Sequence, residues 1–185
     1  MNRILKLLTV IFAVFLISSV ASARQDDERL DRLFDELTET KDAVKAQAIE
    51  RVIWNIWMRS GSDTIDLLMI QGLKDMAAGA YEKANMSFTM IIDMDPAFAE
   101  AWNKRATVRF LVGDLNGSLE DVARVLELEP RHFGAFAGLG QIFEIRNAPE
   151  QALSAFEKAL RINPHMPSVR RKLKILKHEH KGQKI

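Results

Sequence analysis

The chain has 185 residues, enough for one domain or a short array of repeats, and its 48% hydrophobic and 28% charged residues are typical of a globular protein. A formal net charge of +1 gives no electrostatic case for nucleic-acid binding. The absence of cysteine excludes disulfides, thiolate catalysis, cysteine zinc sites and lipid attachment at a cysteine.

Residues 1–23 have the pattern of a secretory signal peptide. Two basic residues precede an apolar run of 11 residues, Leu7 to Ile17, and Ala21-Ser22-Ala23 forms a small-x-small cleavage site. We therefore predict an exported protein, located in the periplasm of a Gram-negative bacterium, whose mature chain begins at Arg24. The alternative is an uncleaved membrane anchor, although the apolar run is short for a spanning helix.

Two amphipathic helices are expected between residues 24 and 62. The first has an apolar stripe from Leu30 to Leu37 with the spacing i, i+3, i+4, i+7, and the second has a stripe from Val44 to Trp57. The sequence Ser60-Gly61-Ser62-Asp63 then combines a helix-ending glycine with N-capping residues. We predict an N-terminal helical hairpin, in which core packing is the favoured role of the two tryptophans, Trp54 and Trp57.

A period of 34 residues dominates the rest of the chain. Pro96, Pro130 and Pro164 share this spacing, and each follows a helical pattern that the proline ends. Within each unit a large apolar residue comes first, a small residue follows four positions later, and a helix-breaking residue marks the middle. A second small residue and a second large apolar residue complete the unit. In this order the positions are Leu68, Trp102 and Phe136; Gly72, Ala106 and Gly140; Gly79, Gly113 and Asn147; Ala84, Ser118 and Ala152; and Phe88, Val122 and Phe156.

Each unit is expected to form two antiparallel helices. Both halves carry apolar residues at helical spacing, and the residue between them tolerates a positive φ, as a helix C-cap requires. The small residues, such as Gly140, allow the two helices of a unit to approach closely. One hairpin cannot bury its own apolar face, so neighbouring units are expected to stack.

The period and the order of these residues resemble the tetratricopeptide repeat (TPR). The resemblance implies an all-α fold, a short right-handed solenoid of antiparallel helix hairpins with repeats at residues 65–98, 99–132 and 133–166. The N-terminal hairpin then takes the place of a preceding repeat, either as a degenerate TPR or as a cap. The third repeat follows the family pattern most closely. The first two depart from it with Gln71 and Arg105 at a leucine position, and with Asp75 and Arg109 at an aromatic position.

Residues 167–185 are expected to form a basic helix with a short tail. Val169, Leu173 and Leu176 lie on one face, and we predict that this face covers the last repeat as a C-terminal capping helix. The alternative is contact with anionic lipid or an acidic partner through the opposite face. That face carries Arg170, Arg171, Lys172, Lys174, Lys177 and Lys181.

The sequence contains no catalytic constellation. His178 and His180 lie two positions apart, on different sides of a helix, which is poor geometry for a metal ligand pair. No phosphate-binding loop, nucleophile elbow or metalloprotease motif is present. The glycines Gly134, Gly138 and Gly140 fall inside a helical repeat, where we expect them to serve packing. We therefore expect neither an enzyme nor a bound metal or cofactor.

The resemblance also implies a binding surface, because TPR arrays bind other proteins in a groove lined by the first helices of successive repeats. Some TPR domains hold a peptide carboxylate with Lys and Asn from consecutive first helices. Asn103 and Lys104 match part of that clamp, but the cations from the first and third repeats are missing. The groove-facing positions implied by the resemblance are Met69, Leu73, Met76, Asn103, Lys104, Thr107, Phe110 and Gln141.

The predicted function is that of a scaffold or adaptor in the bacterial cell envelope, which binds a protein or peptide segment in its groove. The alternative hypothesis is a membrane-associated assembly factor, held at the bilayer by an uncleaved N-terminal helix or by the basic C-terminal helix. Neither hypothesis involves nucleic acid.

Overall fold

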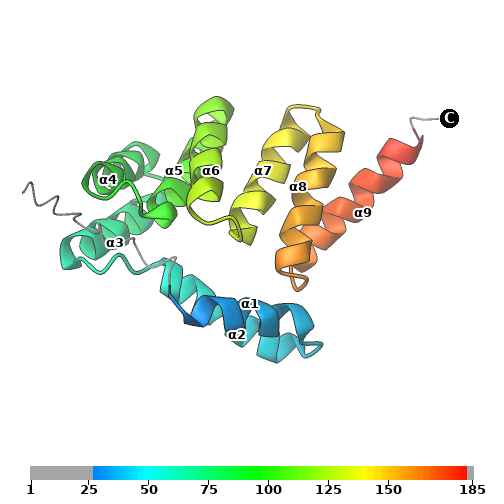
Figure 1. Cartoon of the computed structure of the whole chain (residues 1–185). Helices are drawn as coiled ribbons and strands as arrows, with labels where there is room; N and C mark the ends of the chain where they lie inside the picture. Colours follow the sequence, from blue (N-terminus) through cyan, green and yellow to red (C-terminus); the bar gives the residue numbers. More distant parts are fainter. Residues whose placement is uncertain (1–26, 183–185) are drawn as a thin grey trace, which may run out of the picture.

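A computed structural model describes residues 27–182, and this part of the chain forms nine α-helices without a strand (Figure 1). The prediction of an all-α fold is confirmed. The predicted signal peptide, residues 1–23, lies outside the described residues. The helices are α1 (Arg29–Glu39), α2 (Ala43–Trp57), α3 (Asp63–Ala77), α4 (Tyr81–Met94), α5 (Ala99–Leu111), α6 (Leu115–Leu128), α7 (Phe133–Ile145), α8 (Pro149–Ile162) and α9 (Pro167–Gly182).

The helices from α3 to α8 form three antiparallel hairpins that stack in chain order, and α9 follows the last of them (Figure 1). The turn inside each hairpin contains a residue with a positive φ: 73° at Gly79, 83° at Gly113 and 53° at Asn147. These values confirm the predicted helix-ending positions. Glycine and asparagine adopt this conformation at low cost, which is why the sequence breaks there.

In the first and third hairpins, the two helices meet where a glycine faces an aromatic ring. A Cβ atom on Gly140 would lie 2.3 Å from Cε1 of Phe156, and one on Gly72 would lie 2.6 Å from Cε1 of Phe88. Any larger residue would therefore push the helices apart. The prediction that Gly140 permits close approach of two helices is confirmed.

The departures from the family pattern in the second repeat form a buried ion pair. Arg105 donates two hydrogen bonds to Asp121, of 2.9 and 2.8 Å, and a third of 3.2 Å to the Oγ1 atom of Thr89 on α4. Arg109 lies 3.1 Å from the same carboxylate. The arginines at apolar positions are thus matched by an acid on α6, and Arg105 links the second repeat to the first.

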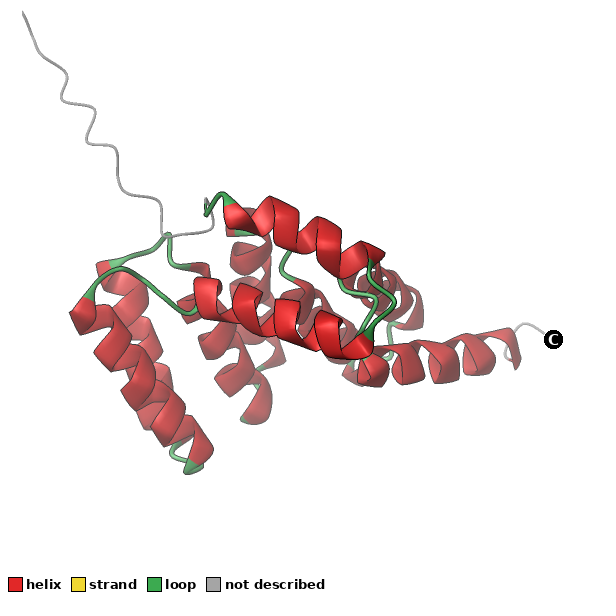
Figure 2. Cartoon of the chain, turned by 90° about the horizontal axis from the view of Figure 1, so that it is seen from below, coloured by secondary structure: helices red, strands yellow, loops and turns green. Residues whose placement is uncertain are grey.

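The N-terminal hairpin packs below the array, against its third repeat and the α8–α9 turn. Its apolar residues form one cluster with Phe133, Ile162 and Met166. Seen from below, the two helices lie in front of the other helices (Figure 2). Arg131 forms an ion pair of 2.5 Å with Asp31 on α1, and His165 donates to the carbonyl oxygen of Thr40 at 3.1 Å. The hairpin therefore does not stack on α3 in the place of a preceding repeat.

The helix α9 covers the last repeat. Val169 is buried, and Leu173 and Leu176 pack beside it against residues of α7 and α8. Two of its basic side chains pair with the array, Lys172 with Glu144 at 2.6 Å and Lys177 with Glu157 at 2.7 Å. The predicted capping contact of α9 is confirmed.

Between residues 27 and 182, none of the helices has both the length and the apolar character that crossing a membrane requires.

Candidate functional site

The first helices of the repeats form one face of the array, which we call the groove face. A hollow of about 170 Å³ lies on it between α5 and α7, above α6, and we call it the α5–α7 hollow. None of the residues that line it is charged. They are Asn103, Ala106, Thr107, Phe110, Ser118, Val122, Gly134, Ala135, Gly138, Gln141 and Ile142.

Two glycines one turn apart on α7 give the hollow its shape. A Cβ atom on Gly134 would lie 2.9 Å from the Cη2 atom of Trp54, so the tryptophan ring of α2 covers this glycine. Gly138 is different, because no side chain or neighbouring element would lie within 4 Å of a Cβ atom there. The expectation that Gly138 serves packing is therefore wrong for the described residues, and its backbone faces open space.

Some of the polar groups around the hollow already form hydrogen bonds within the chain. Thr107 Oγ1 donates to the carbonyl oxygen of Asn103 at 2.9 Å, and Ser118 Oγ donates to that of Ala106 at 2.8 Å. The amide nitrogen of Gln141 contacts the carbonyl oxygen of Ala137 at 3.5 Å. Within residues 27–182, the side-chain carbonyl oxygens of Asn103 and Gln141 receive no hydrogen bond, so the hollow offers two acceptors.

A buried carboxylate lies beside the hollow. Glu100 accepts hydrogen bonds from the amide of Asn103 at 3.1 Å and lies 2.6 Å from Lys104 Nζ and 3.0 Å from His132 Nε2. His132 Nδ1 accepts from the backbone N–H of Ala135 at 3.0 Å, which places the imidazole proton on Nε2, facing the carboxylate. Burial raises the pKa of Glu100, but the charge of Lys104 and the hydrogen bond from His132 outweigh burial and lower it to about 2.

The tryptophans of α2 lie over this carboxylate cluster. The ring of Trp57 is buried and stacks on His132, with centroids 4.3 Å apart and planes 10° apart. Trp54 meets the same imidazole edge-on, and Lys104 Nζ lies 5.2 Å from the Trp54 ring. The prediction of a core role is confirmed for Trp57. The hairpin thus occupies part of the groove face and forms one wall of what remains open.

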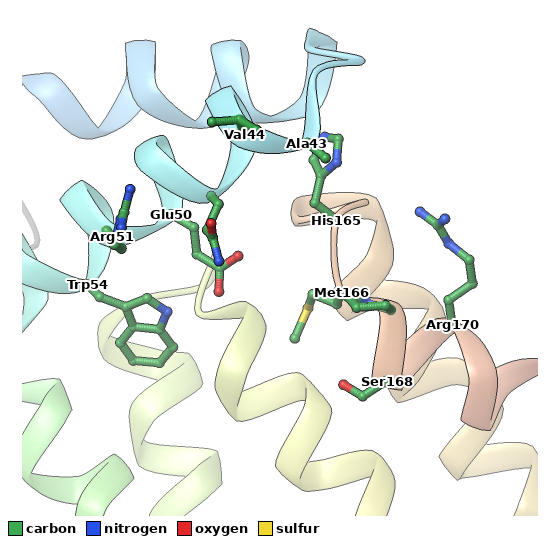
Figure 3. Close-up of a pocket in the computed structure, with 11 residues that line it drawn as sticks. Ala43, Val44, Glu50, Arg51, Trp54, His165, Met166, Ser168 and Arg170 are labelled. Atoms are coloured by element: carbon green, nitrogen blue, oxygen red, sulfur yellow. The ribbon is translucent and has the colours of Figure 1, made fainter.

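A second opening, which we call the α2–α9 cleft, has a volume of about 720 Å³ and lies between α2 and the start of α9. Figure 3 shows Val44, Glu50 and Trp54 on the α2 side and Met166 and Arg170 on the other. Trp54 links the two openings, because it borders this cleft and also covers Gly134 at the edge of the hollow.

The residues predicted to line the groove divide into three groups. Those of the first repeat lie in its core: Met69 is buried, and Leu73 and Met76 pack against the same cluster as Ala101 and Val108 of α5. Lys104 is held by Glu100. The remaining four, which meet at the α5–α7 hollow, are Asn103, Thr107, Phe110 and Gln141.

Sequence reasoning missed Glu100 and His132. The available signal was a pair of ionisable residues 32 positions apart, one near the start of the second repeat and one just before the third. Such a spacing places residues close together when repeats of 34 residues stack. Within residues 27–182, no cluster of three or more histidine, aspartate or glutamate side chains is arranged to hold a metal ion.

Comparison with known proteins gives relatives with the same repeat. A TPR repeat-containing protein of Rhizobium etli is 38% identical over 141 residues, covering 74% of this chain and 67% of the relative. Tetratricopeptide repeat protein 36 of Homo sapiens is 30% identical over 136 residues, covering 71% of each chain. No family model matches the chain.

Among solved structures, the first TPR of Spaghetti (RPAP3), bound to the HSP90 peptide SRMEEVD, superposes with a TM-score of 0.60. Its sequence is 20% identical, and the match covers 62% of this chain and 91% of that domain. At this identity the likeness concerns the fold, and it confirms the solenoid of helix hairpins.

Proposed function

Because the chain belongs to the tetratricopeptide repeat family, we propose that it is a non-enzymatic scaffold that holds a segment of a partner protein on its groove face. TPR folds are protein-interaction modules, and extended surfaces made by stacked repeats are what they bind with. The α5–α7 hollow is the observation that carries the proposal. It is preformed, its lining combines apolar side chains such as Phe110 with polar ones, and it offers the carbonyl oxygens of Asn103 and Gln141 to a partner's N–H groups.

The partner segment has more room than the hollow alone. The α2–α9 cleft continues the open surface past Trp54, so a segment anchored at the hollow can extend between α2 and α9. Arg51 and Arg170 border this cleft, and only Glu50 among its lining residues is acidic. A segment that carries a negative charge at this end therefore suits the cleft better than a basic one.

The clamp for a peptide carboxylate is not part of this proposal. Its one candidate cation, Lys104, lies 2.6 Å from the buried Glu100, and withdrawing it would leave that carboxylate without its nearest cation. The peptide bound to the Spaghetti domain is therefore no guide to the ligand of this chain.

We place this function in the bacterial cell envelope, on the support of the signal-peptide pattern in residues 1–23. Cell fractionation followed by N-terminal sequencing tests the location. A periplasmic chain that begins at Arg24 is the expected result. A membrane-bound chain that retains Met1 would instead favour the membrane-associated assembly factor.

Site-specific photo-crosslinking in living cells tests the function itself. A photoreactive residue replaces the exposed Thr107 at the hollow, or the exposed Ala123 on α6 as a matched control outside the groove face. We expect a discrete adduct with one partner from position 107 and none from position 123. Equal adducts from both positions, or an adduct from position 123 alone, would place binding elsewhere.

A further inference from the structure

Three glycines inside the helices are each covered by an aromatic ring. Phe88 lies over Gly72, Trp54 over Gly134 and Phe156 over Gly140, with ring atoms 2.6, 2.9 and 2.3 Å from the position of a Cβ atom. A glycine leaves the helix backbone bare, so a flat ring can pack against it at close range. Three of the four glycines in the first helices of the repeats thus lie against a ring, whereas Gly117, on α6, faces the carboxylate of Asp114 instead.

Gly138 has the same setting without a ring. It lies one turn after Gly134 on α7, and no side chain or neighbouring element comes within 4 Å of the position of its Cβ atom. Glycine weakens the interior of a helix relative to alanine, and no contact within residues 27–182 requires it here. The space beside Gly138 is therefore open to a group from outside the described residues.

We propose that the α5–α7 hollow is the binding site for one uncharged aromatic side chain of the partner segment, which packs on Gly138. This inference rests on the proposed function and names the anchor that the groove face recognises. The hollow of about 170 Å³ is close in size to an engineered cavity of about 150 Å³ that binds benzene. One ring fills it.

The lining selects against a charged anchor. All eleven residues around the hollow are uncharged, so a lysine or carboxylate side chain would lose its hydration there without gaining an ionic partner. Phe110 borders the hollow and can meet an incoming ring at its edge. The carbonyl oxygens of Asn103 and Gln141 are acceptors for the N–H groups of the partner's main chain on either side of the anchor.

Titration with capped amino acids tests the inference without knowledge of the partner. The probes are N-acetyl-phenylalaninamide, N-acetyl-leucinamide and N-acetyl-alaninamide, followed through the backbone amide signals of Gly138 and Phe110 by NMR. With the binding free energy per non-hydrogen atom of a typical drug, a probe of this size has a dissociation constant on the order of 1 mM. We expect the phenylalanine probe to reach that range, and the alanine probe to bind at least 10-fold more weakly.

Two substitutions at Gly138 fill the hollow from the α7 side. Gly138→Ala and Gly138→Leu meet open space, so both variants are expected to melt at or above the temperature of the unmodified chain. The leucine variant should lose at least 10-fold in affinity for the phenylalanine probe. Ala123→Leu adds the same side chain outside the groove face and should leave probe binding unchanged.

The outcomes separate this inference from the proposed function. Leucine probe binding equal to that of phenylalanine, or full binding by a folded Gly138→Leu variant, would overturn the aromatic anchor. If the crosslink from position 107 persists in Gly138→Leu, the scaffold function stands and the anchor is elsewhere. If the phenylalanine probe binds at Gly138 while position 107 yields no adduct, the ring site stands and the scaffold function fails. Loss of both adduct and probe in folded Gly138→Leu supports both.

Discussion

At its C-terminal end the repeat stack is covered by α9, whereas at its N-terminal end large apolar side chains of α3 remain exposed in the described chain. Leu67 is 67% exposed, yet Ala101 and Ala135, at the same position of the second and third repeats, are 0% and 1% exposed. Each of these alanines is covered by the repeat before it. The first repeat has no such neighbour, because the hairpin that precedes it packs elsewhere.

Order along the chain thus does not decide which end of the array receives a cap. The hairpin α1–α2 covers Phe133, Ile162 and Met166, which belong to the third repeat and the turn after it. It thereby joins α9 in stabilising the C-terminal half, and it narrows the groove face with Trp54. The first repeat keeps its end free for other contacts.

Removal of α9 should have the largest effect, since it turns the covered end into a second free end. Truncation after Pro164 removes the buried Val169 and the half-buried Leu173 and Leu176. Full burial of one such side chain is worth about 1.5–3 kcal/mol, so we expect a loss on the order of 4 kcal/mol in the free energy of unfolding. Urea unfolding and size-exclusion chromatography measure the loss and the accompanying self-association. A truncated chain that stays monomeric and equally stable would show that α9 is no cap.

Acid should act next most strongly, at the site where the hairpin covers the array. The pKa of Glu100 lies at about 2 in the folded chain, against 4.5 for the ordinary side chain. A depressed pKa stabilises the fold fully above about pH 4.5, and this contribution of about 3 kcal/mol is lost as the pH falls towards 2. Unfolding curves between pH 5 and 2 measure it, with Glu100→Gln as the control. Equal pH dependence of the control and the unmodified chain would contradict the assignment.

The glycine–phenylalanine contact inside a hairpin occurs near each end of the array, and overpacking it should cost more at the covered end. Gly140→Leu should cost about 1–3 kcal/mol, because even a Cβ atom there lies 2.3 Å from Phe156. Gly72→Leu makes the equivalent clash with Phe88 at the free end, where α3 can shift away from α4, so we expect a smaller loss. Thermal melting compares the two variants. An unchanged midpoint for Gly140→Leu would mean that the repeat register is wrong.

The smallest effect is expected at the free end itself. Leu67→Gln changes an exposed side chain and should alter the free energy of unfolding by less than about 0.5 kcal/mol. Ala101→Gln makes a comparable change at the covered equivalent, where an added amide is both oversized and desolvated, and should cost about 1–3 kcal/mol or more. Equal losses from the two substitutions, measured by urea unfolding, would refute the view that the first repeat has a free end.

The sequence allowed the hairpins and their turns to be predicted, because both follow from local signals. Helical spacing marked the helices, and Gly79, Gly113 and Asn147 marked the turns. The packing of α1–α2 left no such signal. Its ion pair between Asp31 and Arg131 joins residues 100 positions apart and does not follow the period of 34.

Only some of the positions that the family resemblance places in the groove lie at an opening of the structure. Asn103, Thr107, Phe110 and Gln141 meet at the α5–α7 hollow. Met69 is instead buried against α5, because a flexible methionine fills the space beside the small Ala101. The open space at Gly138 could not be predicted from the sequence either. A glycine covered by a ring, such as Gly140, and a glycine beside open space have the same sequence signal.

The placement of the hairpin also bears on how the chain folds. In most repeat arrays each unit touches only its neighbours, so folding can start anywhere and spread. Here the contacts of Asp31 with Arg131 and of Thr40 with His165 span 100 and 125 residues. Such contacts carry a loop-closure cost before they stabilise anything, which slows folding. Because the α1–α2 hairpin packs on Phe133, Ile162 and Met166, we expect the third repeat to be fully protected against unfolding only after this hairpin has docked.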